Sequence, residues 1–255
     1  MDAIFPHARS NEPAPKIRAR LIDRDGNEPL RISNRLSARE QDRLRSIAKL
    51  MVFPKAGTTI FSRGDDAEFV YVVDQGIVRI TRTALSGQRR ILAFMAPGDL
   101  FGIPDCGVYA NTAETVGPAK LHRFSWPKLR QLMTEEPLLQ HTLLIKLAHD
   151  FRQAQRQMMM LGQQSAHQRL AMFLLDFIRN PDFYDKALAR LTIPVNRFDL
   201  ADYLGTTRET AARAMTRLEE KGLVKRINAQ TVEILNMKGL QQLQHGRARS
   251  GAGAR

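Results

Sequence analysis

The stretch NRFDLADYLGTTRETAARAMTRLEEKG, residues 196–222, predicts two short helices joined by a tight turn. Asn196 can cap the first helix, and Gly205 is suited to end it because a left-handed residue commonly terminates a helix. Thr206 and Glu209 have the spacing of a capping box, which predicts that the second helix begins there. The apolar residues expected to be buried are Phe198, Leu200, Ala201 and Leu204 in the first helix and Ala211, Ala214, Met215 and Leu218 in the second.

This spacing turns the other side of the second helix outward, with Arg208, Glu209, Ala212, Arg213 and Thr216 on it. Arginine can bind guanine O6 and N7 in the major groove of DNA, and a carboxylate can accept a hydrogen bond from cytosine N4. Because the row starts at a helix N-terminus, the pattern favours contacts to DNA bases. The alternative is an ordinary helical hairpin with a solvated charged face.

The segment after these helices is typical of a wing. Residues 223–227, LVKRI, and 231–235, TVEIL, are short strand-like runs around 228–230, which predicts a β-hairpin. Its basic residues would lie beside the helix pair, where phosphates are expected. A winged helix-turn-helix domain is therefore predicted at 181–245, and contacts to the DNA backbone are expected from Thr206, Thr207, Thr216, Arg217, Lys225 and Arg226.

Composition narrows the class of partner. The chain has 255 residues, a net charge of +13 and a pI near 10.4, so the partner is expected to be anionic, and charge alone fits either nucleic acid or an acidic membrane surface. Its one cysteine excludes an intrachain disulfide framework and is consistent with a reducing cytoplasm. The sequence has no signal-like N-terminus and no apolar run of about 18 residues, so we expect a cytoplasmic protein that does not span a membrane.

The first half of the chain predicts a β domain between polar segments. Residues 1–33 are interpreted as a flexible arm and 246–255 as a disordered tail. Ser37 and Glu40 form a capping box that opens a helix with Leu44, Ile47, Ala48 and Met51 on one side. From Val52 the apolar period changes to two, and short strand-like runs alternate with glycines. This pattern favours a β-sandwich or a jelly roll in a domain at 34–136.

A long helix is predicted from Pro137, followed by a second at 166–179 within a helical segment at 137–180. In the long helix, apolar positions recur four and three residues apart, which is the heptad pattern of a coiled coil. The row consists of Leu147, Phe151, Ala154, Met158, Leu161 and Ser165. A narrow apolar stripe opposite a polar face favours a dimer seam, and packing on the helix's own domain is the alternative. Residues 180–189 are interpreted as a linker.

Over about residues 35–236 the chain resembles the Crp–Fnr family of bacterial transcription regulators. The resemblance lies in DLADYLGTTRETAARAMTRLEEKGLV at 199–224, PGDLFG at 97–102 and FSRGDDAEFVYVVDQGIVRI at 61–80. It implies an α+β fold with an N-terminal cyclic-nucleotide-binding-type β jelly roll, a long dimerisation helix and a C-terminal winged helix-turn-helix. It also implies base contacts by Arg208, Glu209, Ala212 and Arg213.

The base code differs from that of many members. Ala212 replaces a serine that often accompanies the glutamate, and Arg208 precedes Glu209 as in cyclic-AMP receptor proteins. A TGTGA-like half-site is therefore expected more than a TTGAT-like one, in a twofold-symmetric target with half-sites about one helical turn apart.

The resemblance does not identify an effector. Asn111 and Thr112 stand where cyclic-nucleotide binders place an Arg–Ser pair for the ribose and phosphate, so cyclic AMP is not expected as a ligand. An iron–sulfur cluster needs four thiolates, and the chain has only Cys106, so the resemblance is to the FixK-like branch that lacks the cluster cysteines. Cys106 is interpreted either as a redox switch or as a buried or incidental thiol. Haem stays an alternative, with candidate ligands His122, His141, His149 and His167.

The expected function is that of a homodimeric, DNA-binding transcription regulator, acting as an activator, with oxygen- or redox-linked gene control as one role. RNA polymerase is an expected partner, through residues 85–90 and 180–186. The first alternative is a regulator that needs a small molecule in the β-roll. An enzyme is a poor fit because the chain carries no P-loop, no G-x-S-x-G and no H-E-x-x-H motif, and no metal site is expected.

Overall fold

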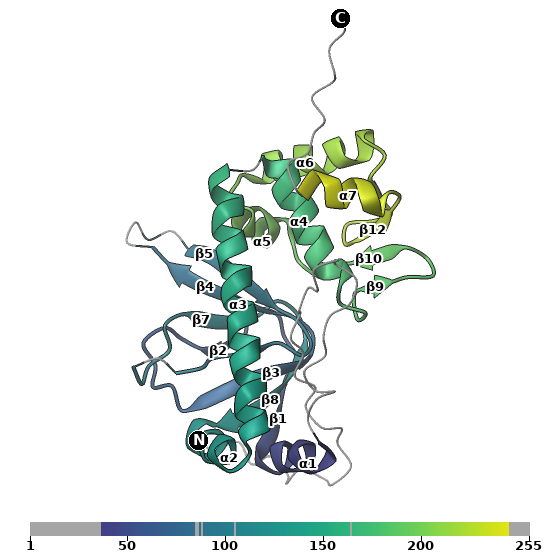
Figure 1. The fold of residues 1–255 in the computed structure, drawn as a ribbon. Helices are drawn as coiled ribbons and strands as arrows, with labels where there is room; N and C mark the ends of the chain where they lie inside the picture. Colours follow the sequence, from purple (N-terminus) through teal and green to yellow (C-terminus); the bar gives the residue numbers. More distant parts are fainter. Residues whose placement is uncertain (1–36, 85–86, 88, 105, 164, 245–255) are drawn as a thin grey trace, which may run out of the picture. The chain divides into compact units, whose positions relative to one another are not determined.

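The computed structural model describes residues 37–84, 87, 89–104, 106–163 and 165–244 (Figure 1), without the side chains of 149, 160, 163 and 244. The arm predicted at 1–33 and the tail predicted at 246–255 lie outside the described residues. The chain forms two compact units, Met1–Asp150 and Phe151–Arg255, which divide within one long helix.

The N-terminal unit begins with helix α1 (Ala38–Ile47), whose capping box is confirmed. The amide of Glu40 donates to Ser37 Oγ over 3.2 Å, and the amide of Ser37 donates to Glu40 Oε2 over 2.7 Å. The helix ends sooner than predicted, because Ala48 already pairs with Phe124 in the sheet. Ala48 and Met51 therefore belong to strand β1 and not to the helix, and the β structure starts before Val52.

Two antiparallel four-stranded sheets form the β-roll, in the orders β1-β8-β3-β6 and β2-β7-β4-β5 (Figure 1). The strands are β1 (Ala48–Phe53), β2 (Thr59–Phe61), β3 (Phe69–Gln75), β4 (Val78–Thr83), β5 (Arg89–Met95), β6 (Leu100–Phe101), β7 (Thr112–Thr115) and β8 (Ala119–Ser125). Helices α2 (Trp126–Glu135) and α3 (Pro137–Gln163) follow. The predicted jelly-roll class and the start of the long helix at Pro137 are confirmed.

Strand β3 is buried on both faces and contributes side chains to two separate cores of this unit. Val70 and Val72 belong to a core shared with Leu44 of α1 and with residues of α2 and α3. Tyr71 and Val73 point the other way, into the interior of the roll. Side chains alternate across a strand, so one strand joins the helical layer to the roll.

In the C-terminal unit, helix α4 (Ala166–Ile178) packs against helices α6 and α7 and against strand β10 of a small sheet. The unit's other elements are β9 (Tyr184–Asp185), β10 (Arg190–Thr192), α5 (Arg197–Tyr203), α6 (Arg208–Glu220), β11 (Val224–Arg226), β12 (Thr231–Ile234) and α7 (Met237–Gln244). The predicted buried face of α4 is confirmed for Leu170, Phe173, Leu174 and Phe177. The β11–β12 hairpin predicted around 228–230 is also confirmed.

Two elements of this unit differ from the sequence-based expectation. The linker predicted at 180–189 is wrong, since β9 pairs with β10 and extends the hairpin into a sheet of order β11-β12-β10-β9. Helix α7 was not predicted. It packs against α4, and its Leu240 is fully buried.

The wing is attached to the end of α6 through Arg226. Its amide donates to Glu219 Oε1 over 2.9 Å, and its guanidinium Nη2 lies 2.6 Å from Glu219 Oε2. Nη2 also donates to Thr216 Oγ1 over 3.4 Å. The hydrogen bonds from Arg226 lower the pKa of Glu219 below its usual value of 4.5. The attachment therefore stabilises the fold above that usual value, and this contribution is lost as pH falls through the lowered pKa.

Glu219→Ala should loosen the wing at neutral pH without unfolding the unit. A partly exposed ion pair contributes at most about 1 kcal/mol to the free energy of unfolding. We expect faster hydrogen–deuterium exchange in peptides that cover 223–235, with a difference from wild type that shrinks as Glu219 becomes protonated. Glu220→Ala, one position along the same exposed helix end, is the matched control. Equal exchange in Glu219→Ala and Glu220→Ala would contradict the role of this ion pair.

Candidate nucleic-acid interface

The turn between α5 and α6 is built by two local hydrogen-bond motifs. Helix α5 is capped by Asn196, whose Oδ1 accepts from the amides of Phe198 and Asp199. It ends in a Schellman motif, in which Thr206 donates to the Ala201 carbonyl, Gly205 donates to the Asp202 carbonyl, and Gly205 has φ +61°.

The predicted capping box of Thr206 and Glu209 is wrong by one residue. Thr206 already completes the end of α5, so Thr207 becomes the N-cap of α6, and its Oγ1 accepts from the Thr210 amide over 3.2 Å. Glu209 is therefore the second residue of α6 and not the third.

The buried side of α6 agrees with the prediction. Ala211, Ala214 and Leu218 are buried and Met215 is half-buried, and α6 packs against α4 and α5. In α5, Ala201 and Leu204 are buried and Leu200 is half-buried, whereas the predicted burial of Phe198 is wrong. The Phe198 side chain is 64% exposed.

All five residues of the predicted outward row of α6 are exposed: Arg208, Glu209, Ala212, Arg213 and Thr216. The pKa of Glu209 is lowered by hydrogen bonds from its own backbone N–H and the Thr207 hydroxyl, and further by Arg208 and Arg213. Glu209 is thus a carboxylate at neutral pH, which can only accept hydrogen bonds. Arg213 Nη2 donates to Thr210 Oγ1 over 3.4 Å. This face presents one acceptor between two forked donors.

The residues predicted to contact the DNA backbone lie in the turn before α6, on α6 and on the wing. Thr207, Thr216, Arg217, Lys225 and Arg226 are exposed, and Thr206 is half-buried. Three of these side chains also have partners within the unit. Thr207 caps α6, the Thr216 hydroxyl donates to the Ala212 carbonyl, and Arg226 binds Glu219.

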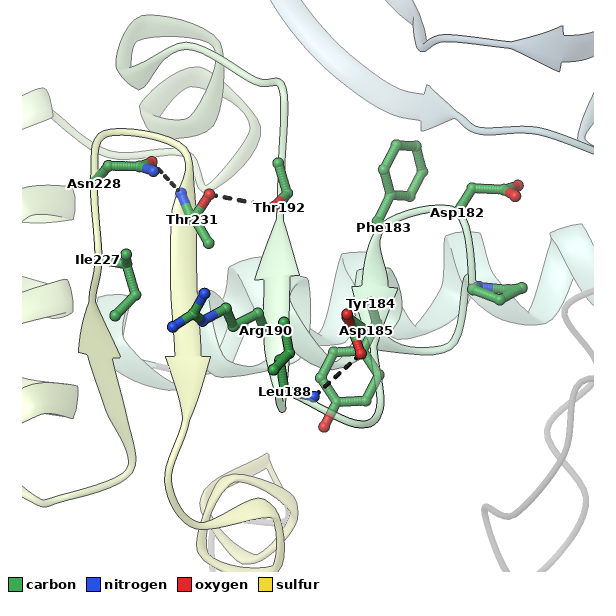
Figure 2. A pocket seen from close by; sticks show the side chains of 11 residues that line it. Asp182, Phe183, Tyr184, Asp185, Leu188, Arg190, Thr192, Ile227, Asn228 and Thr231 are labelled. Atoms are coloured by element: carbon green, nitrogen blue, oxygen red, sulfur yellow. Dashed lines mark hydrogen bonds between the residues drawn. The ribbon is translucent and has the colours of Figure 1, made fainter.

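An open hollow of about 580 Å³, which the sequence did not predict, is lined by residues between 181 and 192 and between 227 and 231. Figure 2 shows it between the β9–β10 hairpin and the turn at Asn228, with Arg190 and Thr192 of β10 in its wall. The Asn228 side chain accepts from the Thr231 amide over 2.8 Å, and this bond closes the wing turn. One wall of the hollow comes from β9, which lies in the predicted linker and pairs with β10.

The predicted dimer seam lies on α3 except for its last member. Leu147, Phe151, Ala154, Met158 and Leu161 are exposed. The prediction that Ser165 continues the row along the long helix is wrong, because Ser165 is the N-cap of α4, where its amide donates to Gln168 Oε1 over 3.0 Å. Leu144 is also exposed and extends the row by one step of three residues, which the prediction missed.

The interior of the β-roll is filled by aromatic rings. Phe61 stacks on Tyr109 with 3.7 Å between ring centroids, and Tyr71 stacks on Phe101 at 5.5 Å. The Tyr109 hydroxyl donates to the Phe69 carbonyl over 2.7 Å, which fixes that ring. Desolvation by burial raises the pKa of Tyr109.

Thr112 and the β-roll residue Asp99 accept hydrogen bonds from backbone amides of the β-roll. Asp99 is buried and accepts from the Ala96 amide over 2.8 Å, and Thr112 Oγ1 accepts from the Arg63 amide over 3.0 Å. Asn111 is half-buried.

The remaining candidate ligands are scattered over the chain. Cys106 is exposed, so a buried thiol is wrong. His122 is buried and His141 exposed, and the side chain of His149 lies outside the described residues. Burial and then the nearby cations Arg217 and Lys221 lower the pKa of His167. Among the described residues, no three His, Cys, Asp or Glu side chains gather as a metal site would require, and no helix there is long and apolar enough to cross a membrane.

Comparison with known proteins matches both units. Residues 52–136 match the model of the cyclic nucleotide-binding domain, and residues 168–243 match that of the Crp-like helix-turn-helix domain. The nitrogen fixation regulation protein FixK of Azorhizobium caulinodans is 32% identical over 208 residues, which cover 81% of this chain and 84% of the relative. The cyclic AMP receptor protein of Thermus thermophilus is 32% identical over 216 residues, which cover 84% and 96%.

A solved structure gives the same result for the fold. The structure of FixK2 from Bradyrhizobium japonicum superimposes with a TM-score of 0.72 at 27% identity, covering 82% of this chain and 100% of that one. With its exposed α6 row, its winged sheet and its single cysteine, the chain belongs to the Crp–Fnr family of DNA-binding transcription regulators, in the FixK-like branch.

Proposed function

We propose that this regulator binds a twofold-symmetric DNA site as a homodimer and contacts bases through the exposed face of α6. The observation that carries the proposal is the row of Arg208, Glu209 and Arg213 at the start of a capped helix. Each arginine can bind the O6 and N7 atoms of a guanine, and Glu209 can accept from a cytosine amino group. This donor and acceptor set favours a TGTGA-like half-site.

Arg208→Ala and Arg213→Ala should each weaken binding to the preferred site by about 1–3 kcal/mol and relax the preference at one base pair. The measurement is a set of dissociation constants for duplexes in which each half-site position is varied, at fixed salt concentration. Arg130→Ala, an exposed arginine of α2, is the control for lost charge. Equal losses on specific and random DNA would exclude base contact by either residue.

The proposed dimer rests on the apolar row along α3. Phe151 is 63% exposed and continues the four–three spacing of its neighbours, so a second copy of the helix can cover it by coiled-coil packing. Pairing would set two α6 helices at a fixed separation, which a twofold-symmetric site of two half-sites requires.

Phe151→Glu should convert the dimer to a monomer, because a carboxylate would be buried without a partner in the seam. Sedimentation of the full chain measures this directly. Met159→Glu is the matched control, since Met159 is 66% exposed on the same helix but lies off the row. A Phe151→Glu protein that still sediments as a dimer would place the interface elsewhere.

We also propose cytoplasmic activation of transcription through contact with RNA polymerase. Support for the contact surface comes from Pro181, Asp182 and Asp185, which are exposed and line the hollow in Figure 2. Half of the second proposed surface, 85–90, lies outside the described residues. The relatives are transcription regulators, and we propose no enzymatic activity for this chain.

A ligand-gated regulator is the second candidate, because residues 52–136 match the cyclic nucleotide-binding domain model. We favour regulation without a cyclic nucleotide or an iron–sulfur cluster. Support comes from the stacked rings of Phe61, Tyr109, Tyr71 and Phe101 in the interior of the β-roll, and from the single cysteine.

Calorimetric titration with cyclic AMP should therefore give no binding heat, and ligand-free protein should bind its DNA site. Titration of the same protein sample with that DNA duplex is the control for active protein. Binding of cyclic AMP that tightens DNA affinity would overturn this proposal and favour the ligand-gated candidate.

A further inference from the structure

We propose that Phe198 of α5 positions Arg208 of α6 for its base contact and thereby sets how strictly one base pair is recognised. This inference rests on the proposed function, since it assigns a second residue to the same DNA-binding face. The guanidinium carbon of Arg208 lies 4.2 Å from the centroid of the Phe198 ring. That separation is within the range of a cation–π interaction.

The exposure of Phe198 is the observation that led to this pair. Its apolar neighbours in α5, Ala201 and Leu204, are buried. Phe198 instead places its ring on the surface, under the first residue of α6. The contact therefore joins the starts of both helices at the end of α6 that is proposed to enter the groove.

Both partners are held at capped helix ends. The Phe198 amide donates to Asn196 Oδ1 over 2.9 Å, and Asn196 Nδ2 donates to the buried carboxylate of Asp199 over 3.0 Å. Arg208 follows directly after Thr207, the N-cap of α6. With both backbones fixed, the ring restricts where the long arginine side chain can go.

A cation–π contact of this kind is compatible with hydrogen bonds from Arg208 to a base. A guanidinium stacks through its planar face, whereas its N–H groups point outward in the plane. The face can therefore rest on Phe198 while the edge donates to guanine O6 and N7. A side chain restrained before binding loses less conformational entropy when the complex forms.

The test compares Phe198→Leu, which keeps an apolar side chain without the ring, with Phe198→Tyr, which keeps the ring. Dissociation constants are measured on the duplex set in which each half-site base pair is varied, for both variants, for Arg208→Ala and for the double variant Phe198→Leu/Arg208→Ala. Since Phe198 is exposed, both variants should fold, and circular dichroism checks this.

We expect Phe198→Leu to lower discrimination about two- to fivefold at the base pair that Arg208 recognises, as the loss of an exposed cation–π contact implies. Other positions should be unchanged, Phe198→Tyr should match wild type, and Phe198→Leu should have no further effect when Arg208 is alanine. A Phe198→Leu effect that persists in Arg208→Ala, or that is equal at every base pair, would overturn the inference. Unchanged discrimination in Phe198→Leu would overturn it as well.

The proposed function fails in a different way. It fails if the wild-type protein does not discriminate between half-site sequences, or if Arg208→Ala and Arg213→Ala both leave discrimination intact. The role of Phe198 alone fails if Arg208→Ala relaxes one base pair and Phe198→Leu does not.

Discussion

The packing of α6 within the C-terminal unit determines which of its side chains can reach DNA. Ala211, Ala214 and Leu218 are buried in that unit, where α6 packs against α4. In a helix of 3.6 residues per turn, burying this side leaves Arg208, Glu209, Ala212 and Arg213 outside. The two alanines let the helices approach closely, so larger residues there would move the whole exposed row. The partner helix α4 is itself supported by α7 and by the contact of Phe173 with Tyr203 of α5, at 5.5 Å between ring centroids.

Hydrogen bonds in the turn between α5 and α6 determine where the two DNA-binding helices end and begin. The Schellman motif at Gly205 uses Thr206 to finish α5, and Thr207 then starts α6. Leu161, near the end of α3, packs against this turn, since a Cβ on Gly205 would lie 3.0 Å from Leu161 Cδ2. One end of the proposed dimer helix is thus in direct contact with the DNA-binding turn, within the same unit. Leu161 therefore belongs both to the proposed dimer row and to the packing around this turn.

The spacing of apolar residues predicted the fold and the exposed α6 row well. A helix or strand with one buried side repeats apolar residues at a regular interval in the sequence. Prediction from this spacing failed where a hydrogen bond or a pairing partner decided the outcome. The capping box at Thr206 fits the sequence, but the Thr206 amide is used by α5. Ala48 fits a helix, but it pairs with Phe124, far along the chain. The short strand β9 carries no sequence signal of its own and forms because β10 is beside it. Phe198 was assigned to the core by hydrophobicity, although its ring lies under Arg208.

In the proposed function, two copies of α6, paired through α3, contact two half-sites without a bound effector. Selection of binding sites from random duplex DNA by purified, ligand-free protein tests it most directly. We expect enrichment of an inverted repeat with TGTGA-like halves, whose centres are about one helical turn, 10–10.5 base pairs, apart. Enrichment of a single unrepeated motif, or no enrichment until a small molecule is added, would contradict it.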